Sequence, residues 1–207
     1  MWHGNRTRER WTFRRVLWPS MEEAEDFWQV TGGSASLSAF SDLKDSGSID
    51  YKGTAVPDDN DCVRVYYGFT DAAGERWEGP VLTGFLDMGE SEHDDVRVSG
   101  SADIRGMLAA ASDTGPGYPL TVAAGIDPVA AARGYAEALG LKVSAAPCSY
   151  RLGGAHTFEQ GDTWLAIINW LLTSADFSSA YTDPWGTVQM QPYVEPVERT
   201  PLWTFRD

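Results

Sequence analysis

The 207-residue sequence predicts an α+β protein, and three observations carry that prediction. Short segments of the amino-terminal half alternate apolar with polar residues, which is typical of antiparallel strands with one buried face. The run Asp-Thr-Gly-Pro-Gly at 113–117 gathers turn-forming residues and marks a domain boundary. Beyond it, two segments with helix start signals and apolar faces predict helices. We therefore expect a β unit followed by an α/β unit.

The first half is predicted to form a hairpin meander. Its strands are expected at 34–39, 63–70, 77–86 and 96–98, with a turn at 71–74. The strongest signal is at 63–70, where Val63, Val65, Tyr67 and Phe69 share one face. The segment at 34–39 is weaker, because its alternation is between serine and small apolar residues.

One short helix is expected to interrupt these strands. Ser20 and Glu23 have the spacing of a capping box, and Pro19 marks the entry to the segment. We expect this helix to reach about Trp28.

Two longer helices are predicted after residue 113. Asp127 as N-cap, Pro128 at the first position and Gly140 past the end bracket the first of them. Its apolar face consists of Val129, Ala132, Ala136 and Leu139. The second opens at Asp162 and runs to about Thr173, and it should be buried on several sides because it is apolar nearly all round.

A hairpin is predicted after the second helix. Asp183-Pro184-Trp185-Gly186 has the residues that a type I turn favours at its first, second and fourth positions. Segments 179–182 and 187–191 would pair across this turn, with Val188 and Met190 facing inward.

Charge excludes one class of function. The formal net charge is -14, but residues 1–20 carry +4 and the remainder carries -18. Such an acidic body repels nucleic-acid phosphates, so sequence-specific nucleic-acid binding is not expected. At 43% hydrophobic and 22% charged residues, the chain should fold rather than stay disordered.

Other sequence features argue against a disulfide framework, a secretory signal peptide and a membrane span. Cys62 and Cys148 are far apart in a chain that needs no disulfide framework. The arginines near the start are followed by no apolar stretch of a signal peptide, and the longest apolar run, 164–172, is far short of the roughly 18 residues of a membrane span. We therefore expect neither a secretory signal nor a membrane span.

Three short motifs could carry chemistry, and each has a plainer interpretation. The tripeptide 113–115 (Asp-Thr-Gly) matches that of aspartic proteases, but its Pro-Gly continuation describes a linker. The acidic run 58–61 fails the calcium-loop pattern, since Cys62 and Val63 occupy its fifth and sixth positions. The run 90–95 surrounds His93 with carboxylates and could bind a metal, but a charged run between strands is usually a solvated loop.

We assign no catalytic, cofactor-binding or metal-binding residue and expect no enzyme. The sequence contains no nucleophile elbow, phosphate loop or dinucleotide fingerprint. Of the nine tryptophans, most should be core, with two or three at interfaces.

The order of segments resembles the siphophage minor tail proteins, tail-tip hub proteins related to the baseplate hub of contractile phages. Four segments carry the resemblance: 8–16 (RERWTFRRV), 33–51, 61–67 (DCVRVYY), and 161–172 (GDTWLAIINWLL) with the following 183–186 and 192–196. These are architectural patterns, and their specificity lies in their order.

The resemblance implies a fold and a set of partners. Residues 1–112 and 192–207 would form a discontinuous antiparallel β-barrel hub domain, with 113–191 as an inserted α/β subdomain. The chain would be a structural virion protein, made in the host bacterial cytoplasm, that assembles into a tail-tip ring, expected to be a trimer, against the distal tail protein and the tape-measure protein. Hub proteins usually continue into a second barrel, whereas this sequence ends at Asp207, so a second barrel would lie on another chain.

Two other functions stay open from the residues alone. Exposed tryptophan rows would suit a receptor- or carbohydrate-binding module of the tail. Scattered carboxylates such as Glu90, Glu92 and Asp94 would be the candidates in a cell-wall hydrolase.

The basic start is the one candidate interface. It is either an ordinary strand, with Trp11 and Phe13 inward and its arginines solvated, or a contact surface. In the second case Arg6, Arg8 and Arg10 would reach an acidic surface on the next subunit or on a tail partner.

Overall fold

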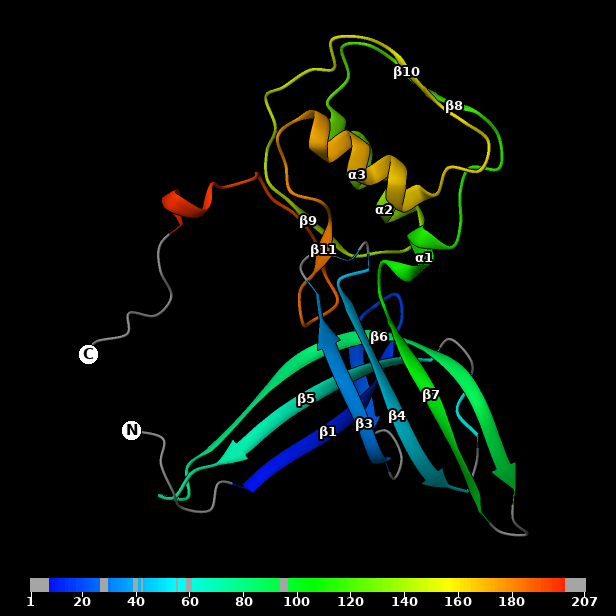
Figure 1. The fold of residues 1–207 in the computed structure, drawn as a ribbon, viewed down its shortest axis with the longest axis vertical. Coiled ribbons are helices and arrows are strands. Elements are labelled where there is room, and N and C mark those ends of the chain that lie inside the picture. Colours follow the sequence, from blue (N-terminus) through cyan, green and yellow to red (C-terminus); the bar gives the residue numbers. More distant parts are fainter. Residues whose placement is uncertain are drawn as a thin grey trace.

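The computed structural model describes residues 8–26, 30–38, 41, 43–54, 56–58, 61–93 and 97–199. A strongly curved antiparallel sheet from the first half of the chain forms one part of the molecule, and a smaller unit built around helices lies above its crest (Figure 1). The α+β class predicted from the sequence is confirmed.

The sheet has seven strands in the order β2-β1-β5-β6-β7-β4-β3. Their bounds are β1 Arg8–Leu17, β2 Glu22–Asp26, β3 Val30–Leu37, β4 Asp45–Gly53, β5 Cys62–Thr70, β6 Arg76–His93 and β7 Val98–Gly106. All neighbouring strands are antiparallel. The 18-residue β6 is the longest strand, and it pairs with β5 along its first half and with β7 along its second. A bulge interrupts each pairing, and bulges bend a strand, so the two ends of β6 diverge from the crest.

The two ends of this sheet lie near each other. β2 and β3 are at opposite ends of the strand order but are separated in sequence by only residues 27–29. Four trans peptide units span at most about 15 Å between Asp26 and Val30. The sheet must therefore curl until its ends approach, although the described parts of β2 and β3 are not paired with each other.

The inner face of the curl is an apolar core. Its buried members are Ile49, Val63, Val65, Leu82, Leu86, Ala102 and Ile104. A Cβ on Gly47 would lie 3.0 Å from Leu82 and 3.5 Å from Ile104, so β4 packs across this core onto β6. Each fully buried leucine or isoleucine contributes about 1.5–3 kcal/mol, which makes this face the main support of the sheet.

The helical unit contains three helices and two small sheets. Its elements are α1 Ala109–Ser112, β8 Leu120–Val122, α2 Pro128–Ala138, β9 Val143–Ala145, β10 His156–Phe158, α3 Trp164–Ser174, β11 Tyr181–Thr182, β12 Val188–Met190 and the 3-10 turn η1 Pro196–Glu198. β8 pairs with β10, while β12 pairs antiparallel with β11 and parallel with β9. α3 is the centre of the unit: Ile167, Ile168, Leu171 and Leu172 are fully buried.

The predicted helix signals are confirmed with one shift. The Asp127 carboxylate accepts from the amides of Val129 and Ala130, and Gly140 follows the helix at φ +79°. α3 begins at Trp164 with Thr163 as its cap, slightly later than predicted. Asp162 instead accepts from the Glu159 amide, in the turn before the helix.

The helix predicted from Ser20 to Trp28 is wrong. Residues 22–26 are the edge strand β2, paired with β1, and residues 27–29 lie outside the described part of the chain. Ser20 closes a turn by donating to the Leu17 carbonyl, and Met21 has φ +64°. Glu23 bonds to side chains of β1 and β5 instead of reaching back to Ser20, so tertiary contacts override the local capping signal.

The strands predicted at 63–70 and 77–86 are confirmed as parts of β5 and β6. The strand expected at 96–98 is β7 at Val98–Gly106, and residue 96 lies outside the described part of the chain. β5 was expected to bury one face, but residues 62–66 are buried on both, because the helical unit covers the outer face at the crest. β3 spans Val30–Leu37 where 34–39 was predicted, residue 39 lies outside the described part of the chain, and Leu37 is 70% exposed. The expected loop at 90–95 is partly wrong, since residues 90–93 belong to β6. The turn at 71–74 and the hairpin at 183–186 are confirmed.

The last described residues stay with the helical unit. Pro192 forms a bridge with Phe177, and the Tyr193 amide donates to the Asp176 carbonyl. Residues 200–207 lie outside the described part of the chain. The return of the segment 192–207 to the sheet therefore stays a prediction.

Candidate assembly surfaces

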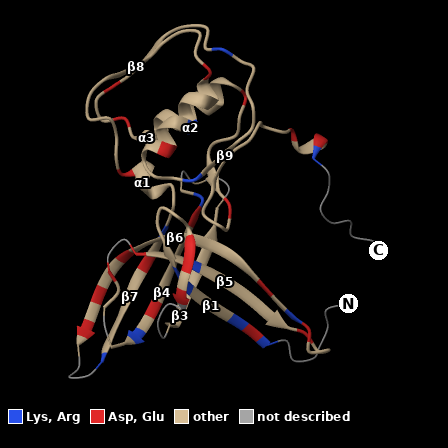
Figure 2. Ribbon diagram, turned by 180° about the vertical axis from the view of Figure 1, so that it is seen from behind, with Lys and Arg blue, Asp and Glu red and all other residues tan. Residues whose placement is uncertain are grey.

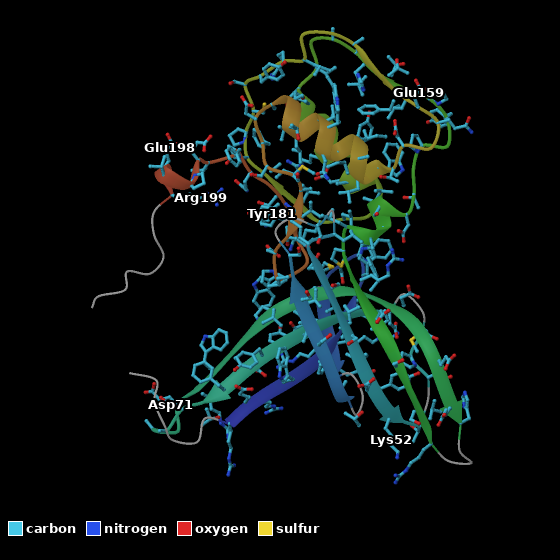
Figure 3. The ribbon with its side chains drawn as sticks, in the orientation of Figure 1. Lys52, Asp71, Glu159, Tyr181, Glu198 and Arg199 are labelled. Atoms are coloured by element: carbon cyan, nitrogen blue, oxygen red, sulfur yellow. The ribbon has the colours of Figure 1, made fainter. Side chains whose placement is uncertain are left out.

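The predicted basic segment lies at one free end of the sheet. Beyond the first bulge, residues 8–12, 66–70 and 76–80 form a three-stranded extension, here called the basic arm. Figure 3 shows Asp71, in its turn, at the tip of this arm. Arg8 and Arg10 lie on β1 and are exposed, and Arg6 lies outside the described residues.

Strand register separates the two faces of the basic arm. On the outer face, Arg8 and Arg76 flank Thr70, while Arg10 is opposite Gly68. None of the three arginines has a hydrogen bond or ion pair to any side chain in the described parts of the chain. The nearby Glu78 is already occupied, because it accepts from the Thr12 hydroxyl at 2.9 Å and lies 3.8 Å from the Arg14 guanidinium.

The inner face of the basic arm is aromatic. Trp11 packs on Tyr67 with ring centroids 5.0 Å apart, and Phe69 packs on Trp77 at 5.7 Å. Trp11 and Phe13 lie on the inner face, as the strand interpretation requires, but Trp11 is 48% exposed and Trp77 is 52% exposed. Cross-strand aromatic pairs stabilise neighbouring strands, so they hold the arm in a defined shape.

A buried arginine joins the sheet to the helical unit. Arg64 of β5 is 3% exposed and donates to the Glu23 carboxylate at 2.7 Å, the Thr83 hydroxyl at 3.0 Å and the Trp185 carbonyl at 3.0 Å. The Thr83 hydroxyl in turn donates to the Pro184 carbonyl at 2.7 Å. The guanidinium also lies 5.0 Å from the Trp185 ring centroid. The turn between β11 and β12 is thereby fixed on the outer face of the sheet.

Glu23 is the shared acceptor of this network. It accepts from Arg14 at 2.8 Å, from Arg64, and from the Tyr66 hydroxyl. Burial raises the pKa of Glu23, but the hydrogen bonds from Tyr66, Arg14 and Arg64 outweigh it and lower the pKa to about 2. Sequence reasoning missed this network, because residues that are hydrogen-bonded in it lie up to 121 positions apart. The one available signal was an arginine inside an otherwise apolar strand pattern.

A second polar contact between sheet and helical unit involves Asp45. The Thr182 hydroxyl donates to its Oδ2 at 2.7 Å, and its buried Oδ1 has no hydrogen-bond partner in the described structure. Burial raises the pKa of this carboxyl above its ordinary value.

Two of the three motifs weighed for chemistry contribute a carboxylate to an ion pair within the fold. Asp113 is bound at 2.7 Å by Arg105, and Asp61 at 2.8 Å by Arg15. In the run 90–95, Glu90, Glu92 and His93 lie on β6, and no three His, Cys, Asp or Glu side chains among the described residues gather closely enough to hold a metal ion. Cys62 and Cys148 are free thiols.

No helix in the described ranges has the length and apolar character needed to cross a membrane.

Solved structures with a similar fold include two tail proteins. The 43 kDa tail protein of prophage MuSo2 from Shewanella oneidensis is 15% identical with a TM-score of 0.58, over 89% of this chain and 54% of that one. A tail protein from Neisseria meningitidis MC58 is 16% identical with a TM-score of 0.57, over 88% and 50%. A chain of the Francisella PdpA-VgrG complex is 7% identical with a TM-score of 0.56, over 92% and 32%.

These likenesses concern the fold. This chain spans about half the length of the two tail proteins. No protein-family model matches the sequence, and a search of curated proteins finds no match.

Proposed function

We propose that this protein is a structural component of a bacteriophage or prophage tail, placed at the tail tip as part of a hub, and that it acts by assembling with other proteins. One observation carries the proposal: nearly nine-tenths of the chain adopts the fold shared by a prophage tail protein and a second tail protein. Supporting it, Asp113 and Asp61, from two of the motifs that could have carried chemistry, form ion pairs with Arg105 and Arg15.

The proposal includes a barrel-like hub domain formed by residues 1–112 and 192–207, with residues 113–191 inserted as an α/β subdomain. The direct passage of the chain from β2 to β3, at opposite ends of the sheet order, supports the barrel-like form, because it requires the sheet ends to approach. The position of α2 and α3 after residue 113 supports the boundary near residue 112.

The proposed partners are further copies of the chain in a ring, expected to be a trimer, together with the distal tail protein and the tape-measure protein. An acidic ring suits a passage for DNA, because it repels phosphate. The proposed location is the virion tail, after synthesis in the host bacterial cytoplasm.

The test is reconstitution. The purified chain is mixed with the distal tail and tape-measure proteins of the same phage or prophage, and complexes are followed by analytical ultracentrifugation and negative-stain electron microscopy. Formation of ring-shaped particles that bind either protein supports the proposal. A chain that binds neither protein and forms no ring contradicts it.

The exposed tryptophans favour one second candidate, a carbohydrate-binding accessory of the tail. Trp77 lies beside a hollow of about 430 Å³ between the strands of the basic arm, lined also by Phe69 and Arg76. Aromatic faces of this kind can stack on sugar rings. Saturable binding on a glycan array that is lost in Trp77→Ala would favour this function over assembly alone.

A further inference from the structure

The sheet has a second free end, and its outer face is acidic. Around the other bulge of β6, which lies between Met88 and Ser91, residues 87–93, 98–103 and 50–53 form a second three-stranded extension, here called the acidic arm. Figure 2 shows acidic residues along β6 and β7 on this side of the sheet and basic residues on β1 on the other. The two arms therefore present opposite charges at opposite ends of one sheet.

Register places the carboxylates of the acidic arm on its outer face. Asp87 is directly opposite Asp103, and Asp50 lies diagonally beyond on β4. The alternation from His93, which pairs with the inward-facing Val98, places Glu90 and Glu92 on the same outer face. All five side chains are exposed: Asp50, Asp87, Glu90, Glu92 and Asp103.

These carboxylates are poorly neutralised within the chain. Like charges opposite each other destabilise a sheet, as Asp87 and Asp103 do here. Arg105 approaches Asp87 only to 3.9 Å and makes its short contact, 2.7 Å, with Asp113. The other four carboxylates have no side-chain partner among the described residues. The acidic arm thus carries charge that a cationic surface would stabilise.

The basic arm is a surface of the matching kind. Its three outer arginines lack partners in the described structure, and the aromatic pairs behind them hold the strands that present them. Guanidinium groups bind carboxylates in a bidentate fork, which gives orientation as well as attraction. Both outer faces point away from the apolar interior of the curl, so they can meet between neighbouring molecules without opening the core.

We propose that the outer face of the basic arm of one copy binds the outer face of the acidic arm of the next copy. Because the two surfaces differ, this is a heterologous contact, and a heterologous contact closes a ring when the rotation between neighbouring copies divides a full turn. The inference rests on the proposed function and identifies the surfaces by which the ring closes. It gives Arg8 and Arg10 a specific counterpart, with Arg76 as a third member.

A salt series alone is an ambiguous test of this contact. The net charge of -14 repels one copy from another, and salt screens that repulsion as well as the attraction between the arms. Reversing charges on each arm separates the two effects. The basic-arm variant carries Arg8→Glu and Arg10→Glu, the acidic-arm variant carries Glu90→Lys and Glu92→Lys, and the combined variant carries all four with the net charge unchanged.

Sedimentation velocity and mass photometry then report the oligomers formed. Each single-arm variant should associate at least about a hundredfold more weakly than the wild type, because it places like charges against each other. The combined variant should recover association to within about tenfold of the wild type. An equimolar mixture of the two single-arm variants should form heterodimers but no closed ring of three, because the two chains must alternate.

A matched control carries Lys142→Glu and Arg133→Glu on the helical unit, and a second carries Glu159→Lys, which Figure 3 places at the far end of that unit. Both controls should associate like the wild type. Circular dichroism confirms that every variant is folded.

Three other outcomes would contradict the proposed contact between the arms. If wild-type rings form and neither single-arm variant weakens them, a different surface closes the ring and the proposed function stands. If the combined variant fails to recover, the arms do not bind each other. If the wild type stays monomeric at about 0.1 mM, the contact is absent, and binding to the distal tail and tape-measure proteins separately decides the proposed function.

Discussion

Replacing Arg64 with alanine should loosen the junction between the sheet and the helical unit. The substitution removes three donated hydrogen bonds and the contact with the Trp185 ring. The Trp185 carbonyl is left without its donor, while the Thr83 hydroxyl retains its bond to Pro184. Glu23 keeps Arg14 and Tyr66 as donors.

The size of the effect follows from what remains unpaired. An unsatisfied buried carbonyl costs about 1–3 kcal/mol, and a lost charged hydrogen bond about 1.5–3 kcal/mol. Glu23 is 24% exposed and keeps two donors, so the loss of its hydrogen bond from Arg64 should cost a free energy at the low end of that range. The free energy of unfolding should therefore fall by about 3 kcal/mol, near the lower limit for breaking a buried ion pair.

The measurement is urea unfolding at pH 7, followed by tryptophan fluorescence and circular dichroism. Arg105→Ala is the matched control, because Arg105 is also ion-paired but 37% exposed, and its loss should cost less than about 1 kcal/mol. Arg64→Lys should fall between the two, since lysine can reach Glu23 but lacks the fork. Equal losses in Arg64→Ala and Arg105→Ala would refute the reasoning.

Four further predictions follow from single residues. The folded pKa of Glu23 is about 2, below its ordinary 4.5, so the stability that the ionised side chain contributes is present above pH 4.5 and is lost as the pH falls towards 2. Glu23→Gln should reduce the loss of unfolding free energy between these pH values by about 2 kcal/mol, measured by acid titration of stability. Burial raises the pKa of Asp45 above 3.8, so its charge costs stability at neutral pH, and Asp45→Asn should raise the unfolding free energy by about 1 kcal/mol at pH 7 but not near pH 3. Ile168→Ala, at a fully buried position of α3, should cost about 3 kcal/mol by the same unfolding assay; a loss below about 1 kcal/mol would mean that the site is not packed as described. The purified protein should not clear a cell-wall suspension, and clearing that disappears in Glu92→Gln would contradict the structural role.

The inner core of the sheet was readable in the sequence, but its outer face was not. The alternation of Val63 and Val65 with other residues predicted strand β5 and its inward side chains. This alternation did not indicate that Arg64 would be buried as well, because the segment that covers Arg64 lies more than a hundred residues further along the chain. Burial of a second face depends on packing between distant segments, which a local pattern does not encode.

The candidate surfaces divide in the same way. Arg8 and Arg10 were identified from the uneven charge of the first 20 residues, but Arg76 was not, because it joins them only through the pairing of β1, β5 and β6. The acidic run at 90–95 was interpreted as a loop, since charged residues in sequence look solvated whether or not they lie on a strand. The pairing of β6 with β7 brings Glu90 and Glu92 to the same face as Asp87 and Asp103.

By itself, the sequence determined what depends on neighbours along the chain. Asp127, Pro128 and Gly140 bound α2, because a cap satisfies amides within a few residues of itself. The tertiary structure decided what depends on partners far away. Ser20 and Glu23 have the spacing of a cap but belong to a turn and a strand. Glu23 accepts hydrogen bonds from three side chains, Arg14, Arg64 and Tyr66, whereas in a capping box it would accept only one from a backbone amide. The curl of the sheet, the burial of Arg64 and the two charged arms all arise from pairing between strands, whose free energy is set by contacts that no local segment contains.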